Sequence, residues 1–306
     1  MSQREVETPH QGRAGTPAYD VLAIDLDGTL LDSRGRVSEA NVGAIERARK
    51  AGVLVTICTG RGLVECLGAL ERIRQEEHVV VAGGSIIACP VERRTRERFG
   101  LPTDVARGVT TRIVDHGHAA LVLKDPLETG YDYLVVTGRG GERLDPTTRW
   151  WFDEHRIQYR EVRRVEDDEH PEHTVRVGAC SYASRLMPLE RAIHGEFGGE
   201  TVMHNFPAVV REEEDGESTH ILEVFHSKAN KWDAVCALAK RRGRDVARIC
   251  AIGDQVNDVV LLKNAALGIA MGNGVEEAKR AAKRMTKSNN EDGVAAAVEM
   301  VLSGAW

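Results

Sequence analysis

The sequence lacks a strong excess of either charge. Its 306 residues carry 41 basic and 47 acidic side chains, which gives a net charge of −6. A slightly acidic balance provides no general electrostatic attraction to nucleic acid or to an anionic membrane. We therefore expect neither of them as a partner.

Paired cysteines and long apolar runs are also missing. The six cysteines are scattered without CxxC or zinc-finger spacing, which is typical of buried free thiols in a reducing compartment. The first 20 residues contain no apolar signal-peptide core, and no run approaches the length of a transmembrane helix. These absences predict a cytoplasmic protein. Residues 1–17 are polar, with proline and glycine, and are expected to form a disordered tail.

What the sequence does contain is an alternation of apolar strands and amphipathic helices. Residues 21–24 favour a buried strand, 38–51 a helix that begins at Ser38, and 53–58 a second strand. Strands and helices that alternate with short links predict an α/β fold with a doubly wound, Rossmann-like parallel sheet.

The alternation is interrupted by a mixed α+β insertion of domain size. We place the core at 18–83 and 216–306 and the inserted cap domain at 84–215. In this interpretation the run HILEVF (220–225) is the strand that returns to the core.

Polar side chains gather where the core strands are expected to end or, for the lysine, shortly after the returning strand. In open α/β sheets, ligands bind outside the carboxyl ends of the strands, so these groups are expected to meet in one crevice. The candidate residues are Asp25, Asp27, Thr59, Gly60, Arg61, Lys231, Asp254, Asn257 and Asp258.

This combination of groups suits phosphoryl transfer through a covalent acyl phosphate. Asp25 is the expected nucleophile, and Asp27 is placed to protonate the leaving oxygen and later to activate water. Thr59 and Lys231 are expected to hold the phosphoryl oxygens. A carboxylate repels a phosphate dianion, and a bridging Mg²⁺ would offset that repulsion. Asp254 would complete the metal shell, with Asp258 acting on it directly or through water.

Each of these segments has a simpler structural interpretation when taken alone. Asp27-Gly28 is a common turn, Thr59-Gly60-Arg61 is a possible helix cap, and lysines such as Lys231 usually face solvent. Asp254 with Asn257 and Asp258 is also able to cap the following helix. Only their joint occurrence, in this order and at strand ends, favours an active site.

The four segments resemble the four motifs of the haloacid dehalogenase (HAD) superfamily. The match rests on "DxDGT" at 25–29, "TGR" at 59–61, a lysine before a helix, and "GDxxND" at 253–258. The position of the insertion is similar to the Cof-type, class IIB cap arrangement, and the tail 268–294 is similar to the closing segment of that subfamily.

This resemblance implies a role for each matching residue. Asp25 would be the nucleophile and Asp27 the acid/base, with the backbone carbonyl of Asp27 on Mg²⁺. Asp254 would ligate the metal and Asp258 would support it. The remaining matches, which would contact phosphate or orient the site, are Thr59, Gly60, Arg61, Lys231 and Asn257.

Three local features of the sequence are harder to interpret. Lys228 competes with Lys231 for the role of the phosphate lysine, and the subfamily pattern favours Lys231. Trp232 replaces the glycine that usually follows this lysine, and Gly83 replaces the asparagine of the usual "NGA". Trp232 either fills the crevice and narrows selectivity or packs on the first turn of its own helix.

We therefore expect a Mg²⁺-dependent phosphatase acting on a small phosphorylated metabolite, such as a sugar phosphate or a related monoester. A phosphomutase of the same fold is the alternative enzyme, and a receiver-like or catalytically silent phosphate-binding module is a less favoured one. Monomer and small homo-oligomer both remain open. The cap offers candidate substrate groups but no geometry; they are Arg149, Trp150 and Trp151.

Overall fold

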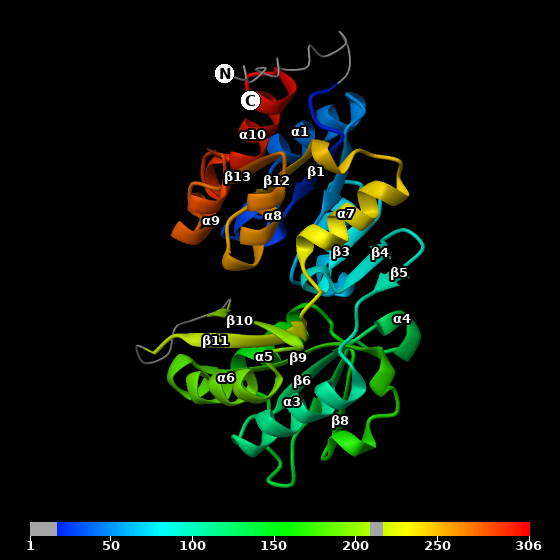
Figure 1. Ribbon diagram of the computed structural model, residues 1–306, viewed down its shortest axis with the longest axis vertical. Coiled ribbons are helices and arrows are strands. Elements are labelled where there is room, and N and C mark those ends of the chain that lie inside the picture. The colour runs from blue at the N-terminus through cyan, green and yellow to red at the C-terminus, as the bar shows by residue number, and fades with distance from the viewer. Residues whose placement is uncertain (1–16, 209–216) are drawn as a thin grey trace, which may run out of the picture.

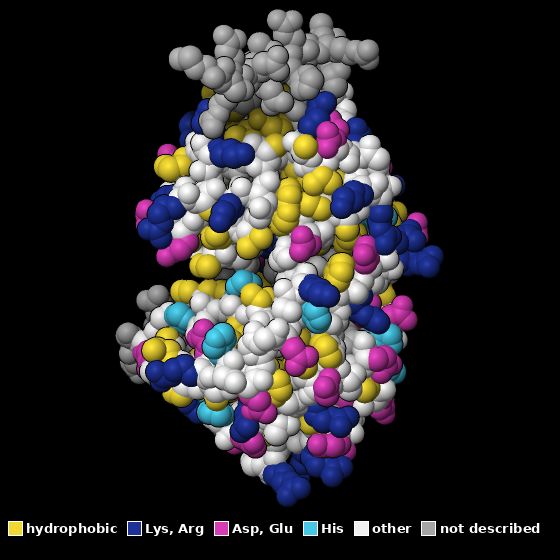
Figure 2. All heavy atoms as spheres, in the orientation of Figure 1, with side chains coloured by type: hydrophobic (Ala, Val, Ile, Leu, Met, Phe, Trp, Pro, Cys, Tyr) yellow, Lys and Arg dark blue, Asp and Glu magenta, His cyan; other side chains and the backbone are white. Residues whose placement is uncertain are grey.

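The computed structural model describes residues 17–208 and 217–306, which form two lobes (Figure 1). The expected disordered tail lies outside the described residues, apart from Pro17. No helix in the described part of the chain has both the length and the apolar character needed to cross a bilayer. On the face shown in Figure 2, basic and acidic side chains are interspersed over both lobes, as the small net charge suggests.

The first lobe is built on a parallel five-stranded sheet, which confirms the expected α/β core. The strand order is β14-β13-β12-β1-β2. These strands are β1 (Val21–Ile24), β2 (Leu54–Ile57), β12 (Ile249–Gly253), β13 (Leu267–Ala270) and β14 (Arg284–Met285). The central strand β1 is buried throughout: Leu22 and Ile24 join one apolar cluster, while Val21 and Ala23 join another. Because side chains alternate across a strand, a sheet covered on both faces requires such an uninterrupted apolar run.

Helices cover both faces of this sheet. Helices α1 (Glu39–Lys50), α2 (Leu63–Arg72) and α10 (Gly293–Leu302) contribute to the first cluster. Helices α7 (Lys231–Arg241), α8 (Val259–Asn264) and α9 (Glu276–Ala281) contribute to the second. The Ser38 hydroxyl accepts a hydrogen bond from the Asn41 amide at 3.2 Å, so α1 begins where the sequence predicts.

A small three-stranded antiparallel sheet extends the first lobe. It consists of β3 (Val79–Val81), β4 (Ile86–Cys89) and β5 (Arg94–Arg98). β3 lies beside the end of β2 through a parallel bridge between Cys58 and Val80, and β4 packs against α7. Residues 84–98 were expected in the insertion, but β4 pairs with β3 and β5 pairs with β4, so the chain reaches the second sheet only after Arg98.

The second lobe contains a six-stranded sheet in the order β10-β11-β9-β6-β7-β8. All pairs are antiparallel except β7 with β8. The strands are β6 (Ala120–Lys124), β7 (Tyr133–Val136), β8 (Tyr159–Val162), β9 (Thr174–Tyr182), β10 (Thr201–Pro207) and β11 (Thr219–His226). The helices are α3 (Thr103–Asp115), α4 (Pro126–Thr129), α5 (Pro146–Glu154) and α6 (Ala183–Phe197).

The assignment of HILEVF to the core sheet is wrong. This run forms β11, which pairs with β9 and β10 in the second sheet. The run is apolar enough for either sheet, and only its partners decide its place. The chain therefore returns to the first lobe after His226, just before α7 (Figure 1).

The second sheet turns one face toward its helices and the other toward the first lobe. Along β9, Val177 and Ala179 pack with α3 and α6, whereas Arg176, Gly178 and Cys180 line a cavity between the lobes. The same alternation places Ile221 and Glu223 of β11 at that cavity. This alternation gives the cavity a second wall opposite the carboxyl ends of β1, β2 and β12.

Candidate active site

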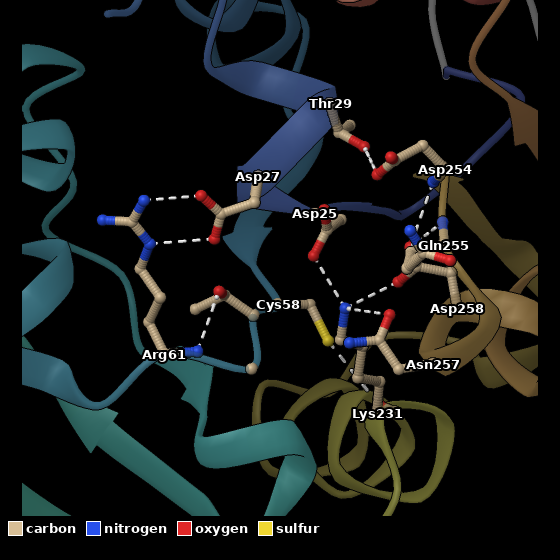
Figure 3. A network of polar contacts seen from close by, with 12 residues as sticks. Asp25, Asp27, Thr29, Cys58, Arg61, Lys231, Asp254, Gln255, Asn257 and Asp258 are labelled. Atoms are coloured by element: carbon tan, nitrogen blue, oxygen red, sulfur yellow. Dashed lines mark hydrogen bonds and ion pairs between the residues drawn. The ribbon is translucent and has the colours of Figure 1, made fainter. Parts of the chain in front are cut away.

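A cavity of about 290 Å³ separates the carboxyl edge of the first sheet from the second lobe. Its first wall includes Asp25 and Asp27 after β1, Gly60 and Arg61 after β2, and Asp254 after β12. Three segments far apart in the sequence thus meet at one edge, as the parallel topology predicts. In Figure 3 the side chains of Asp25, Lys231 and Asp258 point toward one another.

Lys231 lies buried between two carboxylates. Its Nζ is 2.7 Å from Asp25 Oδ1 and 2.6 Å from Asp258 Oδ1 (Figure 3). Burial lowers the pKa of Lys231, but the two carboxylates outweigh this effect and raise it well above its usual value. The lysine is therefore held as a cation. Lys228 is exposed, which favours Lys231 over its competitor.

Asp258 is held firmly by the protein. While Oδ1 meets Lys231, Oδ2 accepts hydrogen bonds from the backbone amides of Asp254 and Gln255, both at 3.0 Å. Both oxygens are thus engaged. Asp258 positions Lys231 and the turn after β12, and this arrangement fits support of a metal better than direct ligation.

Asp254 and Asp25 each keep one oxygen for another partner. Asp254 Oδ1 accepts the Thr29 hydroxyl at 2.8 Å, and Asp25 Oδ1 accepts Lys231. The second oxygen of each receives no hydrogen bond from the described residues, and both carboxylates line the cavity. Gly28 leaves this space open, because a Cβ at this positive-φ position would lie 2.3 Å from Asp254 Oδ2.

The charge of this cluster fits a divalent cation. Ligand oxygens of Asp25, Asp254 and Asp258 lie within 4.8 Å of one another, with one lysine to neutralise three carboxylates. Burial and the charge of Asp258 raise the pKa of Asp25 well above its usual range and that of Asp254 to about 7. A hard cation with oxygen ligands would relieve this repulsion.

Asp27 is held by an arginine from the neighbouring segment. Arg61 Nε lies 2.8 Å from Asp27 Oδ2, and Arg61 Nη2 lies 2.5 Å from Oδ1, a bidentate pair (Figure 3). The guanidinium carbon lies 4.7 Å from the centre of the Trp151 ring, and the Trp151 indole donates to Glu65 Oε1 at 2.7 Å. The orientation of Asp27 therefore depends on α2 and α5 as well as on the turn after β1 in which it lies.

The remaining predicted residues occupy different positions around the site. Asn257 Oδ1 is 3.4 Å from Lys231 Nζ, at the cavity wall. The buried Thr59 hydroxyl accepts from the Arg61 amide at 3.1 Å and is not part of the cavity lining. Gly60 lines the cavity, and its carbonyl accepts from Arg176 of the second lobe at 3.0 Å.

The two departures from the usual pattern now have structural explanations. Trp232 packs against the apolar cluster under α7 and does not line the cavity, so the selectivity hypothesis for it is withdrawn. Gly83 has φ 65°, and a Cβ there would lie 2.9 Å from the Phe225 ring. An asparagine at 83 would collide with Phe225.

Sequence reasoning missed most of the second wall. Of the cap candidates only Trp151 lines the cavity, whereas Arg149 and Trp150 do not. The missed residues include Arg176 and Glu223, which form a buried ion pair. The sequence indicates both residues through the alternation along TVRVGAC and HILEVF. This alternation places Arg176 and Glu223 on the face of the sheet opposite the packed helices.

Comparison with known proteins identifies the family. The pattern of the haloacid dehalogenase-like hydrolases matches residues 22–298. The chain is 29% identical to the putative phosphatase YxeH of Bacillus subtilis, over 93% of this chain and 99% of that protein.

Two further similarities agree with this assignment. The 5-amino-6-(5-phospho-D-ribitylamino)uracil phosphatase YwtE of Bacillus subtilis is 28% identical over 93% of this chain and 99% of its own length. A haloacid dehalogenase-like hydrolase from Bacteroides thetaiotaomicron shares the fold with a TM-score of 0.74 at 23% identity, over 92% of this chain and 99% of its own. The chain belongs to the haloacid dehalogenase-like hydrolase family, as the resemblance of its motifs implied.

Proposed function

We propose that this protein is a Mg²⁺-dependent phosphatase that hydrolyses a small phosphorylated metabolite through an aspartyl phosphate on Asp25. One observation carries the proposal: ligand oxygens of three buried carboxylates lie within 4.8 Å of one another, and one buried lysine pairs with two of these carboxylates. The chain is an enzyme of the phosphoric monoester hydrolase type, as its family and the phosphatases among its relatives indicate.

Asp25 is the nucleophile in this proposal. Lys231 holds Oδ1 at 2.7 Å, which leaves Oδ2 to attack phosphorus from the cavity side. The bond from Oδ2 to phosphorus forms as the ester bond to the leaving alcohol breaks. The ammonium of Lys231 then lies close to the phosphoryl oxygens, where it stabilises their charge. Thr59 and Asn257 complete the expected phosphate contacts.

Asp27 supplies and removes protons. Both oxygens of Asp27 accept from Arg61 before substrate binds, so one oxygen must leave Arg61 and take a proton from solvent. Asp27 then gives this proton to the leaving alcohol in the first step, and its carboxylate takes a proton from the water that attacks the aspartyl phosphate in the second. The bidentate contact with Arg61 keeps the carboxylate of Asp27 in one orientation while it awaits substrate.

Asp25, Asp254 and the backbone carbonyl of Asp27 would hold Mg²⁺, with Asp258 as a supporting residue. When bound, Mg²⁺ neutralises the charge that carboxylates and phosphate bring together.

The second lobe acts in this proposal as a cap that binds the leaving group. It covers the carboxyl edge of the first sheet and supplies the opposite cavity wall. A relative is named for 5-amino-6-(5-phospho-D-ribitylamino)uracil, and sugar phosphates and related monoesters of this size belong in the first screen.

The test is phosphate release from a panel of phosphorylated metabolites, with Mg²⁺ and with EDTA. A hydrolase releases inorganic phosphate without a bisphosphate activator, whereas a mutase requires one and yields an isomeric ester. Brief mixing with ³²P-labelled ester followed by acid quench should leave label on the wild-type chain. Release of phosphate without any labelled protein would reject the covalent route.

A further inference from the structure

The part of the cavity that faces away from Asp25 is mainly apolar. Its walls come from β6, β7, α5, β10 and β11 of the second lobe. The apolar and aromatic residues there are Leu121, Tyr133, Trp151, Phe152, Phe206 and Ile221. Tyr133 and Phe152 contact each other with ring centroids 5.0 Å apart. A leaving group in this space meets mainly ring faces and aliphatic side chains; the polar lining residues of this lobe include Thr147, Thr148, Arg176 and Glu223.

The two guanidinium groups in the described cavity wall are already neutralised. Arg61 uses Nε and Nη2 on the two oxygens of Asp27, and its Nη1 donates to the Glu65 carbonyl at 3.1 Å. The guanidinium of Arg61 lies over the Trp151 ring. Recruiting Arg61 for a second anion would release the carboxylate that the proposed mechanism needs as its acid/base.

The guanidinium of Arg176 also has its charge and its hydrogen-bond donors paired within the protein. It donates to Glu223, to the Tyr133 hydroxyl and to the Gly60 carbonyl, and its side chain is almost completely buried. These contacts tie β9 to β7, β11 and the first lobe. An anion on the leaving group would have to displace Glu223 from its only charged partner among the described residues.

The formal charges of the cavity wall also show that carboxylates outnumber cations there. In the described residues that line the cavity, five carboxylates stand against two guanidinium groups. The carboxylates are Asp25, Asp27, Glu65, Glu223 and Asp254. Lys231 lies behind the wall, shared by Asp25 and Asp258. The second lobe therefore has no cation to offer an added phosphate or carboxylate.

We infer that the cavity selects monoesters whose leaving group carries an uncharged ring and no second anionic group. This inference rests on the proposed phosphatase function. The apolar wall binds the ring. Glu223 Oε1 meets Arg176, while Oε2 receives no hydrogen bond from the described residues, so it is available to accept from a hydroxyl or N–H of that ring. A second anion is rejected because it would be desolvated among carboxylates without a counter-charge.

Four esters separate the effects of ring and charge. 4-Methylbenzyl phosphate and 4-carboxybenzyl phosphate share the benzyl ring and differ in that a carboxylate replaces the methyl group. Glucitol 6-phosphate and 6-phosphogluconate form the corresponding pair without a ring. In wild-type protein with Mg²⁺, kcat/KM should fall by about 10²-fold from the neutral to the carboxylated member of each pair. 4-Methylbenzyl phosphate should exceed glucitol 6-phosphate by about 10-fold.

A variant that adds a cation to the cavity wall tests whether the lack of an unpaired cation causes the rejection of a second anion. Phe206 lies on β10, is only partly buried and lines the cavity, so Phe206→Arg adds a guanidinium without removing a buried partner. This variant should raise the ratio of 4-carboxybenzyl to 4-methylbenzyl phosphate turnover by about 10-fold or more. Phe206→Leu, the matched apolar control, should leave that ratio as in the wild type.

The outcomes distinguish this inference from the proposed function. If carboxylated esters are hydrolysed within about threefold of their neutral partners, the charge selection is overturned while the phosphatase stands. If glucitol 6-phosphate exceeds 4-methylbenzyl phosphate, the ring preference is overturned. If no ester in the wider metabolite panel releases phosphate with Mg²⁺, the proposed function itself fails.

Discussion

The two walls of the cavity differ in how their charged groups are paired. In the first lobe, three buried carboxylates lie close together, and the ammonium of Lys231 pairs with two of them, Asp25 and Asp258. In the second lobe, the buried guanidinium of Arg176 is matched by Glu223, and its other N–H groups meet a hydroxyl and a carbonyl. The first wall has negative charge left over, whereas the second has its charges paired.

This difference distinguishes charged groups that serve catalysis from charged groups that stabilise the fold. Clustered carboxylates cost stability unless something else neutralises them, so their persistence at a strand edge indicates a ligand. A fully paired ion pair needs no ligand and fixes the wall around it. Changes in the first wall should therefore act on catalysis, and changes in the second on selectivity and stability.

The largest effect is expected at Asp25. Asp25→Asn keeps the shape of the side chain but removes its nucleophilicity, so phosphate release should fall by at least about 10⁴-fold. Acid-quench labelling with ³²P-ester should be lost as well. The Tm should not fall, because one of three mutually repelling carboxylates is gone. Turnover near the wild-type rate would refute the role of Asp25.

The next effect is the loss of the divalent cation. EDTA should reduce phosphate release by at least about 10³-fold, and Mg²⁺ should restore it. Ca²⁺ should bind without supporting turnover, because its larger and looser shell permits a bidentate carboxylate at Asp25.

Thermal stability provides a readout of the cation that does not depend on activity. Mg²⁺ should raise the Tm of the wild type but not that of Asp254→Asn. Without Mg²⁺, the variant should be at least as stable as the wild type, because its charge cluster is smaller. An equal Mg²⁺ response in both proteins would remove Asp254 from the proposed metal site.

The contrast between the walls also explains what the sequence could predict. The first wall follows from local rules: an apolar run covered on both faces forms a strand, and parallel strands bring their carboxyl ends together. Asp25 and Asp254 lie at such ends, as the sequence predicts, whereas Lys231 reaches them from the start of α7, after β11 of the second sheet. The Arg61–Asp27 pair was not foreseen, because two segments 34 residues apart form it through side-chain geometry.

The third effect concerns this pair. Arg61→Met should lower kcat by about 10- to 10²-fold, because Asp27 loses the contact that orients it for proton transfer. Arg61→Lys should recover only part of the loss, since an ammonium does not form the bidentate contact. As a matched control, Arg72→Met at the end of α2 removes a surface ion pair with Glu39 and should leave kcat unchanged. A wild-type kcat in Arg61→Met would show that Asp27 needs no such support.

The second wall was harder to predict because its strands are defined by partners distant in the sequence. HILEVF fits a core strand by composition, yet it pairs with β9 and β10 across the insertion. The same error hid Glu223, which belongs to a cavity wall only when its strand lies in the second sheet. The junction at 216 was misplaced for this reason, whereas the one at 84 was misplaced because β4 folds back on β3, its neighbour in the sequence.

The smallest effect is a pH-dependent change of stability in the second lobe. Asp132 is buried at the start of β7, and its Oδ2 accepts the Gln158 amide at 2.9 Å. Burial raises its pKa to about 6, the Gln158 amide opposes the shift, and the charge of Glu65 adds to it. Because the folded state holds this proton more tightly than the unfolded state, the free energy of unfolding falls as pH rises from about 4 through 6. Above that range the ionised group lowers the stability by about 1–3 kcal/mol.

Asp132→Asn removes this ionisation and keeps an oxygen for Gln158. Its Tm at pH 8 should therefore exceed that of the wild type by roughly 2–6 °C, with the difference shrinking toward zero at pH 4, where both forms are uncharged. Calorimetry across this pH range measures the effect, and kcat for the preferred ester should stay unchanged because Asp132 does not line the cavity. A Tm difference that is constant with pH would mean that packing rather than ionisation separates the two proteins. A kcat change at constant Tm would instead place Asp132 among the catalytic groups and break the division between the two walls.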